Sequence, residues 1–421
     1  MDKVKIIFVG LGGRGYGLLR DVCQMNDVEI VAVCDLLPER VERAAKLVQE
    51  QMGNTPVSST DYKELFATVK ADAVITPSAW QAHAPICIDA MKAGMYAATE
   101  VGGATSIEQC WELVRTSRET GMPCMMLENC CYGELEMAVF NLVRTGFFGE
   151  LIHAEGGYRH DLRAEVALGH ERHHYRLDNY KRRNGDVYPT HALGHIAKTL
   201  DINRGNRMVS LVSVASKARG VNRWILENRG EDFENAREAF ALGDVVTTII
   251  TCANGETITL THDTTLPRPY SRNYIIQGTK GIASEDANFS ISIEGLTPQN
   301  DSWDPNEWRP MKEYYETHGH PLWKAYRSAG VKSGHGGMDY LVLRAFIEAV
   351  RDKTDTPIDV YDTAAWMAIT PLSEDSVACG GKPVAIPDFT EGRWLTPRPV
   401  VRGKYCLDEV CEEAFEGITE L

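Results

Sequence analysis

Residues 4–15 of the chain read VKIIFVGLGGRG, a short apolar run followed at once by closely spaced glycines. An apolar run of this length is typical of a buried strand in a parallel sheet. Gly10 permits a tight turn from strand to helix, and Gly12 lets the backbone approach a pyrophosphate. Gly15 lets a helix that starts near Tyr16 pack close to the strand, with its N-terminal dipole facing the phosphates. This pattern restricts the N-terminal region to a dinucleotide-binding fold.

A second apolar run, residues 29–35, supports this interpretation because it ends on an acid. Asp35 follows Gly15 by about 20 residues, where such folds place the carboxylate that binds the adenosine ribose hydroxyls. A chance glycine turn in an ordinary α/β domain would have no reason to carry this acid. Since a carboxylate repels a 2′-phosphate, the sequence predicts NAD rather than NADP as the cofactor.

The length of 421 residues predicts two domains, which we place at residues 1–128 and 129–421. The net charge of -15 argues against a nucleic-acid or anionic-membrane partner. No apolar run approaches the ~20 residues that span a bilayer, and the first strand begins too early to leave room for a signal peptide. The 11 cysteines are scattered and mostly lie in apolar segments, as reduced thiols do. We therefore expect a cytoplasmic protein.

Residues 1–128 alternate between short apolar runs and amphipathic stretches, as expected for a doubly wound α/β domain. The predicted strands end at Gly10, Asp35, Thr76, Glu100 and Asn129. Because the carboxyl ends of parallel strands share one edge of a sheet, we expect the ligand to bind along this edge.

Beyond residue 128 the pattern changes to short alternating segments, including residues 151–158, 209–215, 245–252 and 257–262. Such alternation is typical of antiparallel strands with one buried face, and the Asn-Gly within residues 253–256 is a hairpin signal. The predicted second domain is α+β, built on an open, mostly antiparallel sheet. Helices must cover one face of this sheet, and the other commonly packs on a second subunit. We therefore expect a homo-oligomer, a dimer or tetramer, formed through the sheet.

The residues at several strand ends resemble those of the family of glucose-fructose oxidoreductase and inositol dehydrogenase. They are the glycine pattern, Thr76-Pro77 followed by His83, and Glu100. That family adds an antiparallel substrate domain to a dinucleotide-binding domain. Its dehydrogenases usually read Glu-Lys-Pro at the fourth strand end, where the lysine polarises the reacting hydroxyl. This chain reads Glu100-Val101-Gly102 and lacks the lysine.

Five further motifs resemble a narrower branch, the NAD-dependent α-N-acetylgalactosaminidases of glycoside hydrolase family 109, which also place a valine after the glutamate. The motifs are ENCCY at 128–132, GYRHDLR at 157–163, YPTH at 188–191, PRPYS at 267–271 and GHGGMD at 334–339. The resemblance covers residues 4–395. It implies a glycosidase that acts on α-N-acetylgalactosaminides or a related glycoside.

An enzyme of this kind uses NAD although hydrolysis needs no net redox change. Oxidising C3 of a pyranose to a ketone acidifies the hydrogen on C2, so that a modest base removes it and the C1 glycosidic oxygen leaves by elimination. Water then adds to the unsaturated ketone, and the stored hydride returns to C3. NAD-dependent glycosidases are exceptions to the two-carboxylate scheme. The predicted substrate domain likewise carries no convincing pair of catalytic carboxylates.

The resemblance also implies which residues carry this chemistry. His191 is the predicted acid/base at the reacting hydroxyl, because an imidazole exchanges protons near neutral pH. Tyr158 is the predicted base at C2, and the cation of Arg176 would favour its phenolate. The predicted substrate-binding residues are Arg176, Tyr188, Pro189, Thr190 and Tyr270. The predicted NAD-binding residues are Gly10, Gly12, Gly13, Arg14, Gly15, Asp35, Trp80, His83, Glu100, Val101 and Asn129.

The same residues also have purely structural interpretations. A histidine at a helix start, as His191 is beside Thr190, caps structure as readily as it catalyses, and the motif match favours catalysis. For Tyr158 and Tyr270, aromatic packing in strands is the ordinary explanation without the resemblance. Trp80 would be an exposed loop aromatic, except that it follows a turn at the ligand-binding edge.

Two groups of histidines have the spacing of metal ligands. His170, His173 and His174 are clustered, and His191 and His195 stand four residues apart. No cysteine or acid follows at ligand spacing, and the zinc motif HExxH is absent. We therefore predict a solvated loop for the first group and no metal.

Three functions are compatible with this pattern. The first is a redox-neutral glycosidase with tightly held NAD. The second is an NAD-dependent sugar or polyol dehydrogenase that has lost the lysine and uses His191 as its base. The third, a non-enzymatic dinucleotide sensor, would give Tyr158, Arg176 and Tyr188 no reason to converge. Val101 favours the glycosidase over the dehydrogenase.

Overall fold

The computed structural model describes residues 3–332 and 334–416, and within them the chain forms two compact units. The first unit contains residues 3–133, 325–332, 334–364 and 399–416. The second contains Glu134–Lys324 and Ala365–Arg398. Two helices cross a boundary between these segments, α12 (Pro321–Ala329) and α14 (Val360–Met367).

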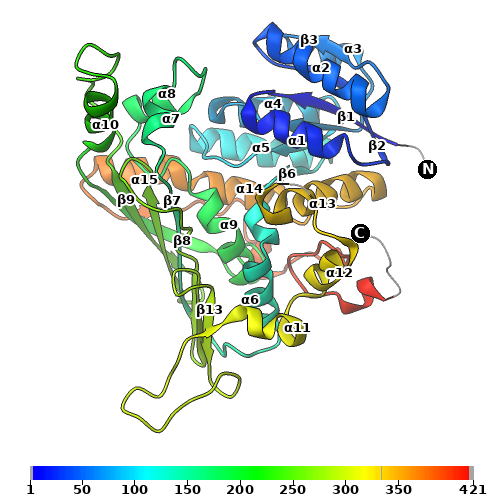
Figure 1. Cartoon of the computed structure of the whole chain (residues 1–421). Helices are drawn as coiled ribbons and strands as arrows, with labels where there is room; N and C mark the ends of the chain where they lie inside the picture. The colour runs from blue at the N-terminus through cyan, green and yellow to red at the C-terminus, as the bar shows by residue number, and fades with distance from the viewer. Residues whose placement is uncertain (1–2, 333, 417–421) are drawn as a thin grey trace. The chain divides into compact units, whose positions relative to one another are not determined.

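The first unit is built on a six-stranded parallel sheet in the order β3-β2-β1-β4-β5-β6, which confirms the predicted doubly wound α/β fold (Figure 1). Apart from the exposed edge strand β3, its strands are mostly buried, as expected for a sheet covered by helices on both faces. The elements along residues 3–133 are β1 (Val4–Val9), α1 (Gly13–Val22), β2 (Val28–Cys34), α2 (Pro38–Met52), β3 (Val57–Ser59), α3 (Tyr62–Thr68), β4 (Ala73–Thr76), α4 (Trp80–Lys92), β5 (Tyr96–Thr99), α5 (Ile107–Thr120), β6 (Cys124–Met126) and the 3-10 helix η1 (Asn129–Tyr132).

The turn from β1 to α1 depends on glycines that leave no room for a side chain. Gly10 has φ +103°, and a Cβ there would lie 2.8 Å from the Ser78 backbone. A Cβ on Gly15 would lie 2.0 Å from the Gly10 carbonyl oxygen. Helix α1 begins at Gly13, three residues before the predicted start near Tyr16, so Gly15 lies inside its first turn. The prediction was wrong on the start because glycine carries no propensity signal for a helix N-terminus at this turn.

Later segments of the chain also belong to the first unit, which differs from the two consecutive domains predicted at 1–128 and 129–421. The segment 325–364 contains the 3-10 helix η3 (His335–Gly337) and α13 (Met338–Asp352), and residues 399–416 contain η5 (Glu412–Phe415). Helix α13 is buried along most of its length and packs against α1 and η1. Its Arg344 forms a fork of hydrogen bonds with Asp27, at 2.7 and 3.0 Å.

The second unit is built on a nine-stranded sheet in the order β14-β13-β12-β11-β7-β10-β9-β8-β15 (Figure 1). Only β7 and β10 pair in parallel, so the sheet is mostly antiparallel, as predicted. Its strands are β7 (Leu151–Arg159), β8 (Met208–Ala215), β9 (Val245–Cys252), β10 (Thr257–Asp263), β11 (Ile275–Gly278), β12 (Gly281–Ser284), β13 (Ser290–Ile293), β14 (Arg309–Pro310) and β15 (Val384–Ala385). The remaining elements are α6 (Glu134–Arg144), α7 (Arg163–Ala167), α8 (Arg176–Arg182), α9 (Thr190–Thr199), α10 (Gly220–Asn228), η2 (Met311–Tyr314), α11 (Tyr315–His318), α15 (Ile369–Ala378) and η4 (Arg393–Leu395).

One face of this sheet is covered by helices of the same unit. Helix α9 packs on β7 and α15 packs on β8. Gly156 makes the first contact possible, because a Cβ there would lie 2.6 Å from the Ala192 carbonyl oxygen of α9. Buried and more exposed residues alternate along β9, so its other face is open within this unit.

No helix among residues 3–332 and 334–416 is long and apolar enough to cross a membrane.

Substitution of Gly15 tests the close packing of α1 on β1. We expect Gly15→Ala to lower the free energy of unfolding by about 1–3 kcal/mol, because its Cβ must displace the Gly10 backbone. Gly17→Ala is the matched control, since a Cβ at Gly17 meets nothing within 4 Å. Gly17→Ala should raise the free energy of unfolding by about 0.5–1 kcal/mol, because alanine is more stable than glycine inside a helix. Urea unfolding measures both, and equal effects would contradict the packing argument.

Candidate functional site

The glycine-rich turn of the first unit leaves space for a bound phosphate. A Cβ on Gly13, the first residue of α1, would meet nothing within 4 Å, and Gly12 approaches only Arg40, at 3.5 Å. The first N–H groups of a helix have no partner within it and carry the positive end of its dipole. The turn can therefore hold a pyrophosphate at the N-terminus of α1.

Asp35 lies at the end of β2 and is buried. Its carboxylate accepts hydrogen bonds from the Leu11 N–H at 2.6 Å and from the Leu37 N–H at 3.0 Å. It therefore fixes the glycine-rich turn itself. A carboxylate has about four acceptor positions, so Asp35 retains capacity for the ribose hydroxyls that the sequence predicts as its ligand.

The segment after β5 is shaped around an indole ring. Trp80, in the first turn of α4, is buried, and a Cβ on Gly102 would lie 2.4 Å from its Cδ1. Glu100 accepts the N–H of Val101 at 3.1 Å and the Arg14 Nε at 2.9 Å. Glu100, Val101 and Trp80 thus form one packed group at the carboxyl edge of the sheet.

His83 is buried one turn further along α4 and is held neutral. Burial lowers the pKa of His83 to about 4, although its hydrogen bond to the Ser78 carbonyl oxygen opposes this. Its Nε2 donates that bond at 2.9 Å, which leaves Nδ1 as an acceptor without a partner in the described part of the chain. A cofactor hydroxyl or amide would satisfy this buried atom, so the residue fits a nicotinamide cofactor.

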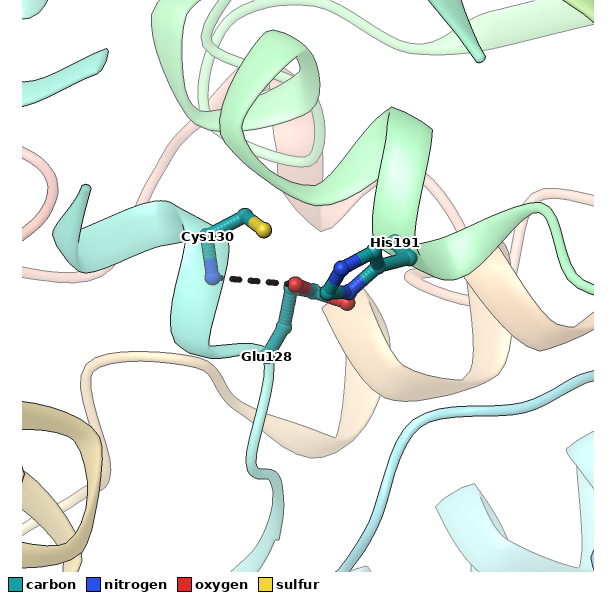
Figure 2. Close-up of side chains that lie close together, drawn as sticks. All are labelled: Glu128, Cys130 and His191. Atoms are coloured by element: carbon teal, nitrogen blue, oxygen red, sulfur yellow. Dashed lines mark hydrogen bonds between the residues drawn. The ribbon is translucent and has the colours of Figure 1, made fainter. Parts of the chain in front are cut away.

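The end of β6 turns into η1 through a buried acid. Figure 2 shows Glu128 with its Oε1 accepting the Cys130 N–H, at 3.0 Å. The next residue, Asn129, is buried and donates to Asp339 at 2.7 Å. Asp339 also binds Arg14, so a residue of α13 organises two of the predicted NAD-binding side chains.

In the second unit, the predicted sugar-binding residues gather around Tyr158, near the end of β7. The ring centroid of Tyr158 lies 4.5 Å from that of Tyr188, 5.5 Å from that of His191 and 6.4 Å from that of Tyr270. His191, which Figure 2 also labels, belongs to the first turn of α9. Tyr188 and His191 are buried, whereas Tyr270 is 49% exposed. Four side chains from three separate segments thus form one aromatic cluster.

Arg176 brings a positive charge to this cluster. Its guanidinium carbon lies 5.7 Å from the Tyr158 ring centroid and 5.3 Å from that of Tyr188, within cation–π range. Its Nη1 donates to Glu165 at 2.7 Å, which fixes the side chain although it is only 9% exposed. This arrangement places a cation beside Tyr158, which the sequence predicts as the base at C2.

A neutral histidine lies on the strand next to Tyr158. His262 on β10 is paired in register with Tyr158, and their ring centroids are 6.5 Å apart. Burial, together with the charge of Arg176, lowers the pKa of His262 to about 3. His262 therefore stays uncharged at neutral pH and adds no competing cation.

The turn that carries residues 188–191 is anchored to α15. The Asp186 N–H donates to Ser373 Oγ at 2.8 Å, and Thr370 Oγ1 donates to the Asp186 carbonyl oxygen at 2.7 Å. The Asp186 carboxylate in turn accepts the Tyr188 N–H at 3.2 Å. Pro189 and Thr190, predicted as substrate-binding, are buried at the start of α9. Their side chains support the turn.

A buried ion pair lies near His191. Burial raises the pKa of Glu136, while the charge of Arg272 opposes this shift most and His191 opposes it further. Glu136 and Arg272 are 2.5 Å apart. His195, one turn along α9, has its pKa held well below the ordinary value by burial and by the charges of Arg272 and His191. Glu136 and His191 therefore interact electrostatically within this unit.

The other group of histidines, at residues 170–174, lies in the segment between α7 and α8. His170 is half-exposed and lies 2.5 Å from Glu234 and 3.8 Å from Asp178. His174 lies 3.6 Å from Glu165, the acid that also binds Arg176.

Sequence reasoning missed the residues that hold the predicted ones in place. Asp339 binds Arg14 and Asn129, Glu165 binds Arg176, and Asp186 binds the backbone of Tyr188. Only Asp339 had a signal, since it ends one of the motifs that carry the family resemblance. The others are ordinary acids whose roles depend on contacts distant in sequence.

Two family models match consecutive parts of the chain. Residues 4–128 match the oxidoreductase family with an NAD-binding Rossmann fold, and residues 132–396 match the C-terminal domain of glycosyl hydrolase 109. A glycosyl hydrolase family 109 protein of Stenotrophomonas maltophilia is 39% identical over 96% of this chain and 93% of its own length. An α-N-acetylgalactosaminidase of Tannerella forsythia is also 39% identical, over 93% of this chain and 87% of its own.

Solved structures share the fold at lower identity. An inositol dehydrogenase homolog from Azotobacter vinelandii, complexed with NAD+, has a TM-score of 0.66 at 16% identity and covers 91% of this chain and 97% of its own. An NAD-binding oxidoreductase from Klebsiella pneumoniae has a TM-score of 0.69 at 15% identity and covers 91% of this chain and 99% of its own. The N-terminal part of the chain is thus an NAD-binding Rossmann domain, as the sequence predicts.

The buried carboxyl of Asp186 generates a pH-dependent prediction. Burial raises the pKa of Asp186 to about 7, against its hydrogen bond from the Tyr188 N–H, whereas the unfolded value is 3.8. The folded protein therefore binds this proton more tightly, and its stabilising effect is present below pH 3.8 and lost as pH rises to about 7. Relative to Asp186→Asn, the wild type should lose about 2–4 kcal/mol of unfolding free energy across this range. Parallel stability–pH curves for the two proteins would contradict the prediction.

Proposed function

Because the chain belongs to the glycosyl hydrolase 109 family, we propose that it is an NAD-dependent glycosidase of α-N-acetylgalactosaminides or a related glycoside. The observation that carries this proposal is the cluster of Tyr158, Tyr188, His191 and Arg176, in a chain with an NAD-binding domain. The absence of a lysine after Glu100 supports the glycosidase over a sugar dehydrogenase.

The first unit would hold NAD through residues already described. Gly10 and Gly15 permit the close turn, Gly12 and Gly13 leave room for the pyrophosphate at the start of α1, and Asp35 would bind the ribose. Trp80, His83, Glu100, Val101 and Asn129 would line the nicotinamide half. When bound, NAD supplies a reversible hydride acceptor at C3 of the sugar, and oxidation there acidifies the hydrogen on C2.

Tyr158 is the proposed base that removes the C2 proton. The guanidinium of Arg176 lies over the Tyr158 ring and places a positive charge beside it. The neutral His262 on the adjacent strand adds no second charge. Loss of the C2 proton then expels the glycosidic oxygen from C1, and Tyr158 can return a proton when water has added.

His191 is the proposed acid/base at the C3 hydroxyl. Its imidazole accepts the hydroxyl proton as C3 is oxidised and returns it when C3 is reduced. Glu136 is an acid of the same unit that interacts electrostatically with His191. Tyr188, Arg176 and the half-exposed Tyr270 would bind the sugar hydroxyls, and Pro189 and Thr190 would hold the turn between Tyr188 and His191.

We further propose that two copies of the chain associate through the open face of the second unit's sheet. Val212, Ile249, Thr259 and Glu155 are neighbours across β8, β9, β10 and β7 on this face. Ile249 is 48% exposed, and Val214 on the same face is 56% exposed. Flat faces of threonine and branched aliphatic residues pack well on a second sheet.

The proposed compartment is the cytoplasm. All 11 cysteines lie in the described part of the chain and are free thiols, and all but Cys379 are buried. Free buried thiols are typical of proteins that work in a reducing compartment.

Deuterium exchange at C2 tests the elimination mechanism. In D2O the released sugar should carry deuterium at C2, because Tyr158 exchanges the C2 proton before water adds. NADH should not accumulate, since the hydride returns in the same turnover. Tyr158→Phe and His191→Ala should each lower turnover by about 10²–10⁴ with NAD still bound. Mass spectrometry and NMR of the product, with NADH absorbance, measure these outcomes.

The matched control is Tyr180→Phe, which also removes one phenol hydroxyl from the second unit. The Tyr180 hydroxyl lies 2.7 Å from Thr264 Oγ1, so its loss should affect stability and leave C2 exchange in place. A product without deuterium at C2 would refute the mechanism even if hydrolysis occurs. NADH accumulating in step with substrate consumption would identify a dehydrogenase.

Charged substitutions on the sheet test the proposed assembly. Ile249→Lys should convert the oligomer to a monomer in light scattering coupled to gel filtration, because burying an unpaired ammonium is costly. Leu226→Lys is the control, since Leu226 is 45% exposed on α10 and not on the sheet. A monomeric wild type, or dissociation by both variants, would contradict the sheet interface.

A further inference from the structure

Asp339, at the start of α13, makes an unusual number of hydrogen bonds for one carboxylate. It accepts a fork from Arg14, with Nη1 at 2.6 Å and Nη2 at 2.9 Å. Asn129 Nδ2 donates to it at 2.7 Å, and His335 Nδ1 lies at 2.8 Å. Its side chain is only 3% exposed, so these partners replace nearly all of its water.

The carboxylate is charged at every working pH. Burial alone would raise its pKa, but the hydrogen bonds from His335 and Arg14 hold the pKa of Asp339 well below the ordinary value. A buried carboxylate is stable only while its partners stay in position. Arg14 and Asn129 are therefore held in position as well, because moving either one would remove a hydrogen bond from the buried charge.

Two partners of Asp339, Arg14 and Asn129, are themselves predicted NAD-binding residues. Arg14 belongs to the first turn of α1 and also donates to Glu100, at 2.9 Å, while Glu100 accepts the Val101 N–H. Asn129 begins η1, directly after β6. One carboxylate therefore connects the ends of β1, β5 and β6, three strand ends of the edge that binds the cofactor.

The backbone before Asp339 is built for this placement. His335, Gly336 and Gly337 have φ values of +50°, +65° and +100°, a run of left-handed residues just before α13. A Cβ on Gly337 would lie 2.8 Å from the Tyr326 ring, so only glycine fits the turn. Left-handed backbone persists where the surroundings over-determine it, and it is concentrated at functional sites.

We propose that Asp339 is a positioning residue of the NAD site, which holds Arg14 and Asn129 in the geometry that retains the cofactor. The proposal rests on the NAD site of the proposed function and is independent of its glycosidase chemistry. The segment 334–339, distant in sequence from the glycine-rich turn, thereby becomes part of the cofactor-binding apparatus.

Asp339→Asn tests this role, with Asp27→Asn as its matched control. Both changes replace an aspartate that accepts an arginine fork in the first unit. Each pair has one member on α13, which is Asp339 itself in one pair and Arg344 in the other. Asp27, however, pairs with Arg344 and touches none of the predicted NAD ligands. Asp339→Asn should raise the NAD dissociation constant roughly 10-fold or more, because a charge-assisted fork is lost. Asp27→Asn should leave it unchanged while lowering the melting temperature of the NAD-free protein.

Calorimetric titration of NAD into stripped protein gives the dissociation constant without any glycosidase assay. In an Arg14→Gln background, Asp339→Asn should lower the NAD affinity less than in the wild type. The reason is that Asp339 acts through Arg14 and Asn129, and its bond to Arg14 is already removed. If Asp339→Asn is not recovered folded, Asp339→Glu keeps the charge, moves it by one methylene, and should also weaken binding.

Wild-type NAD affinity in Asp339→Asn or in a folded Asp339→Glu would overturn the proposal. So would an equal loss of affinity in Asp27→Asn, which would mark a general loosening of α13. Absence of glycoside cleavage by the wild type would refute the proposed function alone, and the NAD titrations would still decide the role of Asp339.

Discussion

The pairing of Arg14 with carboxylates from two distant segments holds the cofactor edge of the first unit together. Glu100 follows β5 and Asp339 begins α13, and neither acid is stable in its buried position without a cation. The backbone gains from this pairing as well, since the spare oxygen of Glu100 accepts the Val101 N–H. Charge satisfaction, rather than apolar packing alone, therefore sets the positions of the strand ends around NAD.

In the second unit a buried charge is stabilised in a different way, by aromatic rings as well as by a carboxylate. Arg176 is nearly buried, donates to the carboxylate of Glu165, and lies over the rings of Tyr158 and Tyr188. A lysine ammonium is more strongly hydrated, whereas a guanidinium stacks on rings and still donates at its edge. The arginine can therefore contact Glu165 and both phenol rings at once.

The sequence predicts the scaffold well because periodicity and glycine spacing are local properties. The parallel sheet, the antiparallel sheet and the NAD site follow from runs of a few residues. The exact start of α1 does not, since Gly13 has no helical preference of its own. The sequence also does not predict that α13 belongs to the first unit. Nor does it predict the hydrogen bonds made by Asp339, Asp186 and Glu165. Each depends on contacts between residues far apart along the chain, for which one sequence carries no local signal.

The replacement of the dehydrogenase lysine is coupled to the packing of Trp80. In Glu-Lys-Pro a proline would occupy the position of Gly102, and any Cβ there would lie 2.4 Å from the Trp80 ring. The buried indole and the glycine therefore belong together, and a lysine at position 101 would add a second cation beside Arg14. With valine there, position 101 offers no group that exchanges a proton.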